Sequence, residues 1–163
     1  MTIQGKVIKY GNNVNTDVII PSKYLVLTDP FALAAHAMEA LDSDFSQKTK
    51  ERKIVVAGRN FGCGSSREQA PIALKYAGIT CIVADSFARI FYRNAINIGL
   101  PLLECDGISA QIHDGDELRV NLEKGLIEDV SQGLRFNAVP IPSFLMAILE
   151  KGLVDYIKSK RSG

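Results

Sequence analysis

The sequence has few of the residues and segments that membrane-spanning, disulfide-rich or metal-binding proteins require. Its 163 residues include no tryptophan and two histidines, and no run of about 18 apolar residues occurs. Its three cysteines, Cys63, Cys81 and Cys105, are odd in number and lack C-x-x-C spacing. This pattern argues against a disulfide framework and against a metal or iron–sulfur site built by this chain alone. We therefore expect a protein that does not span a membrane and that folds without disulfides or a metal of its own.

The chain also has no large excess of positive or negative charge. Lys and Arg number 19 and Asp and Glu 18, for a net charge of +1, and basic residues cluster only in KTKERK and KSKR. No basic stripe indicates a nucleic-acid partner. The N-terminus lacks the basic and then apolar segments of a signal peptide, which predicts a cytoplasmic protein. The length and the 47% hydrophobic content suit one soluble domain over residues 1–163.

The hydrophobic periodicity that is present predicts an α/β fold. Strands are expected at 3–10, 53–57, 79–84, 100–103, 118–122 and 126–130. Helices are expected at 30–41 after Asp29 as N-cap, from the serines at 65 and 66 to Gly78, from Ser86 to Gly99, and from Pro142 with an interruption at 151–152. Residues 42–52 are expected to form an exposed connection. Strands and helices that alternate from 53 to 103 are typical of a parallel unit, and the later hairpin favours a mixed sheet.

The chemistry concentrates in residues 58–78, GRNFGCGSSREQAPIALKYAG. After a strand, Gly62 and Gly64 flank Cys63, and Ser65, Ser66 and Arg67 follow at the expected helix start. Such a turn presents backbone N–H groups and the positive end of a helix dipole. The stretch therefore predicts an anion-binding site.

The two serines have a simpler alternative role. Ser65 with Glu68, and Ser66 with Gln69, both have the spacing of a helix capping box. However, Arg67 offers a fork that matches a carboxylate, and positive surroundings would stabilise a serine alkoxide. A proton-abstracting serine beside a bound carboxylate is therefore a coherent alternative to a cap.

Other candidate residues carry weaker signals. The stretch contains neither the G-x-S-x-G elbow of a serine hydrolase nor a P-loop lysine. His36 lies in an expected apolar helix, and His113 lies in an expected turn. Cys63 is interpreted as a small residue in a tight loop rather than a nucleophile. Arg89 and Arg93, four apart, are interpreted as a solvated face or a subunit contact without a catalytic role.

Three segments together carry a resemblance to a known family. NTDVIIPSKYL at 15–25, GRNFGCGSSREQAP at 58–71 and SFARIFYRNAINIGLP at 86–101 resemble the small subunits of 3-isopropylmalate dehydratase, the separately encoded swivelling domain of the aconitase family. The resemblance implies a single swivelling β/β/α domain, of the α/β class, with a mixed sheet flanked by helices.

The resemblance also implies an activity. It implies a hydro-lyase of leucine biosynthesis that interconverts 2-isopropylmalate and 3-isopropylmalate by dehydration and rehydration. The implied cofactor is a [4Fe–4S] cluster carried by a large subunit and not by this chain, so activity needs both. By motif position, Ser65 corresponds to the catalytic base, and Ser66 and Arg67 to residues that bind a carboxylate of the small dicarboxylate substrate. Self-association of isolated small subunits, through the 86–98 helix, is an open alternative that the sequence does not decide.

Specificity is expected in the loop YLVLTD, residues 24–29. In similar homoaconitase subunits an arginine tends to stand where this chain has Val26. Here Val26 and Leu27 would offer an apolar wall to an isopropyl group, because a carboxylate facing such a wall would lose its hydration. Core packing is the alternative role for Val26. The alternative functions are a methylmalate or citraconate hydratase, a homoaconitase, or an anion-binding module without catalysis.

Overall fold

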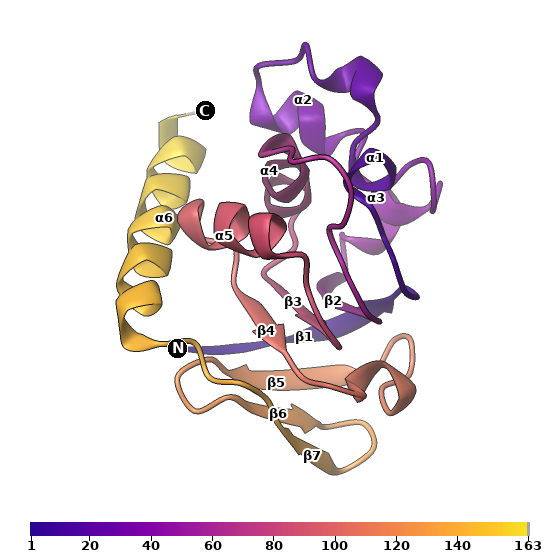
Figure 1. Cartoon of the computed structure of the whole chain (residues 1–163), viewed down its shortest axis with the longest axis vertical. Coiled ribbons are helices and arrows are strands. Elements are labelled where there is room, and N and C mark those ends of the chain that lie inside the picture. Colours follow the sequence, from indigo (N-terminus) through magenta and orange to yellow (C-terminus); the bar gives the residue numbers. More distant parts are fainter. Residues whose placement is uncertain (163) are drawn as a thin grey trace.

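A seven-stranded mixed sheet organises the computed structural model, which describes residues 1–162 and the side chains as far as residue 158 (Figure 1). Its strands are β1 (Thr2–Lys9), β2 (Arg52–Ala57), β3 (Cys81–Ala84), β4 (Leu102–Glu104), β5 (Glu117–Asn121), β6 (Leu126–Asp129) and β7 (Leu134–Asn137), in the order β4-β3-β2-β1-β5-β6-β7. β1 to β4 are parallel, and β5, β6 and β7 continue the sheet from β1 in antiparallel order. The predicted mixed sheet is confirmed.

Helices flank the sheet. They are α1 (Thr16–Ile19), α2 (Pro30–Ala34), α3 (Phe45–Lys48), α4 (Gln69–Tyr76), α5 (Arg89–Asn97) and α6 (Ser143–Ser162), with short 3₁₀ turns η1 (Ser22–Tyr24) and η2 (Ile108–Ala110). The order β2, α4, β3, α5, β4 confirms the predicted parallel unit. None of the helices in residues 1–162 combines the length and the apolar character that crossing a membrane requires.

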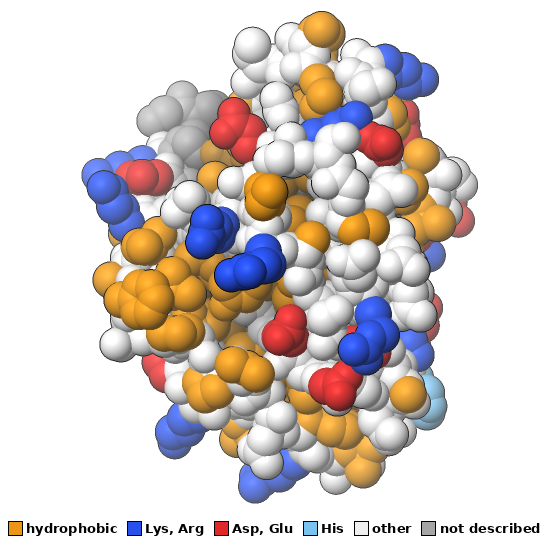
Figure 2. All heavy atoms as spheres, in the orientation of Figure 1, with side chains coloured by type: hydrophobic (Ala, Val, Ile, Leu, Met, Phe, Trp, Pro, Cys, Tyr) orange, Lys and Arg blue, Asp and Glu red, His pale blue; other side chains and the backbone are white. Residues whose placement is uncertain are grey.

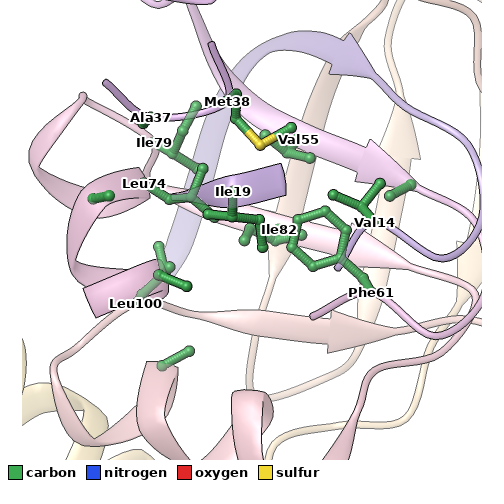
Figure 3. Close-up of a cluster of buried hydrophobic side chains, with 14 of the residues drawn as sticks. Val14, Ile19, Ala37, Met38, Val55, Phe61, Leu74, Ile79, Ile82 and Leu100 are labelled. Carbon is green, nitrogen blue, oxygen red and sulfur yellow. The ribbon is translucent and has the colours of Figure 1, made fainter. Parts of the chain in front are cut away.

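Both faces of the central strands are buried, and this explains their unbroken apolar runs. Along β2, Val55 points into one hydrophobic cluster while Ile54 and Val56 point into the other. The first cluster packs β2 and β3 against α1, α2 and α4, and Figure 3 shows part of it around Ile82. The second packs the same strands against β5, β6 and α6.

The sheet curls so that the segment after β7 lies beside β4. There the Val139 N–H donates to the Glu104 carbonyl at 3.0 Å. β7 itself was not expected from the sequence. Its four residues are mostly exposed, so they lack the alternation of apolar and polar residues that marks a half-buried strand.

Two expected features between residues 30 and 52 are wrong. Asp29 caps α2 as predicted, but α2 ends at Ala34 rather than near residue 41. Met38 adopts a left-handed φ of 61° and donates its N–H to the Ile19 carbonyl at 2.8 Å, which a continued helix would prevent. Residues 42–52 are not simply an exposed connection, because α3 buries Phe45 in the first cluster.

The expected interruption of the last helix is also wrong. α6 runs through Gly152 without a break. A Cβ added at Gly152 would lie 2.3 Å from the Gly99 backbone nitrogen. Gly152 therefore allows α6 to approach the end of α5 and does not end the helix.

Candidate active site

The loop of residues 58–68 is anchored on one side to the loop that follows β3. Because β2 and β3 are parallel neighbours, the loops that leave their carboxyl ends lie side by side. The Phe61 N–H donates to the Ser86 carbonyl at 3.1 Å, and the Ala88 N–H donates to the Phe61 carbonyl at 3.0 Å. The sequence predicted that Ser86 begins α5, but α5 begins at Arg89. The Ser86 Oγ instead accepts the Asn60 N–H at 2.8 Å.

The same loop is anchored on its other side to residues 14–16. The Gly62 N–H donates to the Val14 carbonyl at 2.7 Å, and the Thr16 N–H donates to the Cys63 carbonyl at 2.9 Å. The buried Thr16 hydroxyl donates to the Ser65 carbonyl at 2.7 Å. These bonds fix the backbone on both sides of the glycines, so the Ser65 side chain leaves a rigid support.

Gly62 lets α5 approach this loop closely. It has a left-handed φ of 83°, and a Cβ there would lie 2.2 Å from Cγ of Phe91 on α5. The Phe61 ring meets the Phe91 ring edge-on, with 5.4 Å between the centroids. The start of α5 is thereby held against the glycine-rich loop.

A cavity of about 350 Å³ lies between this loop and the start of α5. Ser65, Ser66, Arg67 and Arg89 all line it. Both serines are exposed, and within the part of the chain that the structure describes neither hydroxyl has a hydrogen-bond partner. α4 begins later than predicted, with Glu68 at the N-cap position and no side-chain cap bond. The serines therefore do not cap the helix, and the simpler alternative fails.

Arg67 bridges two elements at the wall of the cavity. Its guanidinium forms an ion pair with Asp17 on α1, and its Nη1 donates to the Ile20 carbonyl at 3.0 Å. The side chain is only 14% exposed. A guanidinium has five N–H donors, so these two contacts hold the group in place and leave donors for a ligand.

Arg89 also lines this cavity, which the sequence did not indicate. The sequence predicted a solvated face or a subunit contact for Arg89 and Arg93, and both side chains are exposed. Among the described residues Arg89 forms no ion pair. A signal was available, because the first helical residue after one parallel strand lies beside the loop that follows the neighbouring strand.

Val26 and Leu27 lie elsewhere, in the loop between η1 and α2. Neither lines the cavity that contains Ser65. The Val26 side chain is 83% exposed, which rules out core packing, while Leu27 is half-buried against the first cluster. The base of this loop is fixed by the Tyr24 ring, which stacks on the His36 ring at 3.8 Å. His36 lies beyond the end of α2 and not in the expected helix.

The cysteines do not fit an iron–sulfur cluster. Cys81 and Cys105 are buried in the second cluster, where burial raises the pKa of the Cys81 thiol to about 12. Cys63 belongs to the anchored loop. In residues 1–162, no group of three or more His, Cys, Asp and Glu side chains is arranged to hold a metal ion.

Comparison with known proteins agrees with this architecture. The model of the aconitase C-terminal domain matches residues 10–106, and the chain belongs to this family. More particularly, the chain is 52% identical over 163 residues to the 3-isopropylmalate dehydratase small subunit of Ruminiclostridium cellulolyticum. The alignment covers 99% of this chain and 100% of the relative. It is 56% identical over 159 residues to the isopropylmalate/citramalate isomerase small subunit of Methanocaldococcus jannaschii, covering 97% of this chain and 95% of the relative.

A solved structure shares the whole fold. The crystal structure of a 3-isopropylmalate dehydratase chain from Methanocaldococcus jannaschii superposes with a TM-score of 0.88 at 46% identity, covering 99% of this chain and 96% of that one. The resemblance predicted from three short segments is therefore confirmed, and so is the predicted fold class.

Proposed function

We propose that this chain is the single-domain small subunit of a 3-isopropylmalate dehydratase, a hydro-lyase that works in the cytoplasm in leucine biosynthesis. The observation that carries the proposal is the cavity in which Ser65, Ser66, Arg67 and Arg89 meet. Two hydroxyls and two guanidinium groups on an anchored loop suit a small dicarboxylate. The names of the relatives supply the reaction.

Each polar group has a role that its position supports. Ser65 would remove the proton from the carbon next to a substrate carboxylate. Ser66 and Arg67 would hold that carboxylate, since Arg67 is already oriented by Asp17. Arg89 adds a second positive charge to the same cavity. Together the guanidinium groups would favour the serine alkoxide, more strongly once a partner excludes water.

The proposed site is completed by a second chain. Dehydration also requires a group that assists the departure of the hydroxyl, and the residues of this chain offer no metal-binding cluster in the described range. A [4Fe–4S] cluster on the large subunit would supply a Lewis acid for that step. This chain would bind and orient the substrate and move the proton at Ser65. Neither protein is expected to turn over substrate alone.

The loop that carries Val26 is proposed to select the substrate. Its exposed valine would face a substrate only after the large subunit closes over the chain. Val26→Arg should weaken turnover of 2-isopropylmalate and admit substrates with a distal carboxylate, because the guanidinium would pair with that group. Steady-state kinetics of the reconstituted complex with 2-isopropylmalate and homocitrate measure this. Unchanged kinetics with both compounds would contradict the assignment of the loop.

The test of the proposed base is Ser65→Ala, compared with Ser43→Ala at an exposed serine outside the cavity. Loss of a positioned base should lower kcat of the reconstituted complex by about 10²–10⁴-fold. Assembly with the large subunit should persist, as measured by gel filtration, and Ser43→Ala should behave as wild type. An anion-binding module would instead lose only about one hydrogen bond, about 1 kcal/mol of ligand affinity. Retention of full turnover by Ser65→Ala would overturn the proposed role.

A further inference from the structure

A second, larger hollow lies beside the active-site cavity, between α5, the start of α6 and residues 139–142. Its volume is about 620 Å³. Several of its side chains are apolar and strongly exposed, namely Val139 at 63%, Phe144 at 68% and Ile148 at 39%. Figure 2 shows hydrophobic side chains gathered over α5 and the first turns of α6, with basic side chains next to them. We call this surface the α5–α6 groove. A contiguous exposed apolar surface of this kind marks an interaction site.

The charge around the α5–α6 groove is one-sided. Arg89 and Arg93 both line it, and neither forms an ion pair among the described residues. The acidic residue that lines the groove, Glu104, already accepts the Phe87 N–H at 3.3 Å. The groove therefore suits a partner that brings both apolar side chains and carboxylates.

The groove also adjoins the active site. Arg89 lines both the α5–α6 groove and the cavity that contains Ser65. A protein surface that closes the active-site cavity would therefore extend onto the groove without a gap. This continuity links the occupant of the groove to the subunit that completes the site.

A second copy of this chain fits less well. In a two-fold symmetric dimer the same patch meets itself. Pairing through the groove would bring Arg89 and Arg93 towards their own copies, with one engaged carboxylate per chain to compensate. Like charges brought together at an interface oppose association. The charge pattern thus favours an unlike partner over self-pairing through the 86–98 helix, the alternative that the sequence left open.

We propose that the α5–α6 groove docks the iron–sulfur large subunit, through an apolar segment of that subunit flanked by carboxylates. This inference rests on the proposed function, because that function requires a large subunit. It adds that the contact extends from the serine cavity across α5 to the first two turns of α6, with Phe144 as its apolar centre and Arg93 as its charged rim.

The test measures binding and does not depend on turnover. The dissociation constant between this chain and the purified large subunit of the same organism is measured by titration calorimetry. Phe144→Asp places a carboxylate in the groove, and Arg93→Glu reverses the rim charge. Val154→Asp is the matched control, since Val154 lies on the same helix, is 49% exposed and does not line the groove.

The proposal predicts that Phe144→Asp raises the dissociation constant at least about tenfold. Arg93→Glu should weaken binding and reduce its salt dependence, and Val154→Asp should leave binding unchanged. Unfolding curves for the isolated chains should coincide, because all three side chains are exposed.

Two results would overturn the groove assignment. One is wild-type affinity for the large subunit in both Phe144→Asp and Arg93→Glu. The other is an isolated chain that sediments as a dimer, in which Phe144→Asp gives monomers while affinity for the large subunit is unchanged. That result would assign the groove to self-association. A wild-type chain that does not bind the large subunit would refute the proposed function itself, which distinguishes the two failures.

Discussion

Replacement of Gly62 by alanine tests the packing that brings α5 to the serine loop. The φ of 83° at Gly62 is left-handed, which costs a residue with a Cβ about 1–2 kcal/mol. The new methyl group would also lie 2.2 Å from Cγ of the buried Phe91 ring. Overpacking of this kind costs about 1–3 kcal/mol more. Gly62→Ala should therefore lower the free energy of unfolding by about 2–5 kcal/mol.

A second glycine separates the two contributions. Gly107 has a φ of 80°, and an added Cβ there meets no atom within 4 Å. Gly107→Ala should therefore pay only the backbone cost of about 1–2 kcal/mol. Urea unfolding of wild type and both variants, with linear extrapolation to water, gives the comparison.

The difference between the variants is the decisive quantity. A cost for Gly62→Ala that exceeds that for Gly107→Ala by about 1 kcal/mol or more supports the close approach of α5. Equal costs would refute the reasoning, because they would mean that Phe91 moves away freely. Such freedom would also remove the physical reason for placing Arg89 beside Ser65.

Two further predictions concern α6 and its surroundings. Gly152→Ala should destabilise the chain by about 1–3 kcal/mol by urea unfolding, although alanine favours a helix, because its Cβ would lie 2.3 Å from the Gly99 nitrogen; a gain in stability would contradict the close contact. Burial lowers the pKa of Lys75 to about 8 from its usual 10.5. Below pH 8 the amine is charged in both the folded and the unfolded state, and burial of the charge destabilises the folded state by its full amount. This destabilisation disappears as the pH rises towards 10.5, because the folded state then holds the neutral amine. The free energy of unfolding of wild type, minus that of Lys75→Met, should therefore rise by about 1–2 kcal/mol from pH 7 to pH 9.5, and a flat difference would contradict it.

Local patterns predicted the framework well. β2, β3 and β4 each carry an apolar run buried on both faces, and helices separate them, so a parallel unit followed from the residues alone. The serine loop was predictable for the same reason, since its glycines and polar residues directly follow β2. The hairpin of β5 and β6 also alternates clearly.

Features that depend on distant contacts were not predictable. The left-handed turn at Met38 forms because its N–H meets Ile19. The sequence predicts a helix interruption at Gly152, whereas the structure shows that the glycine makes room for the Gly99 backbone. In each case the contacting residue is remote in sequence, so the local pattern does not predict the contact.

The loop that carries Val26 and Leu27 shows a different limit. Val26 and Leu27 were grouped with Ser65 by resemblance, but in this chain they do not line its cavity. Their proposed role depends on a second protein, whose surface would bring the loop and the cavity to one substrate. A single sequence contains no information about that surface.

Reconstitution with the large subunit shows whether this chain supplies half of an active site. Increasing amounts of the chain are added anaerobically to a fixed amount of the iron–sulfur large subunit, and the conversion of 2-isopropylmalate is followed. We expect no turnover by either protein alone, and a rate that rises with added chain and saturates when the large subunit is fully bound. Turnover by the chain alone, or an assembled complex that leaves 2-isopropylmalate unchanged, would contradict it.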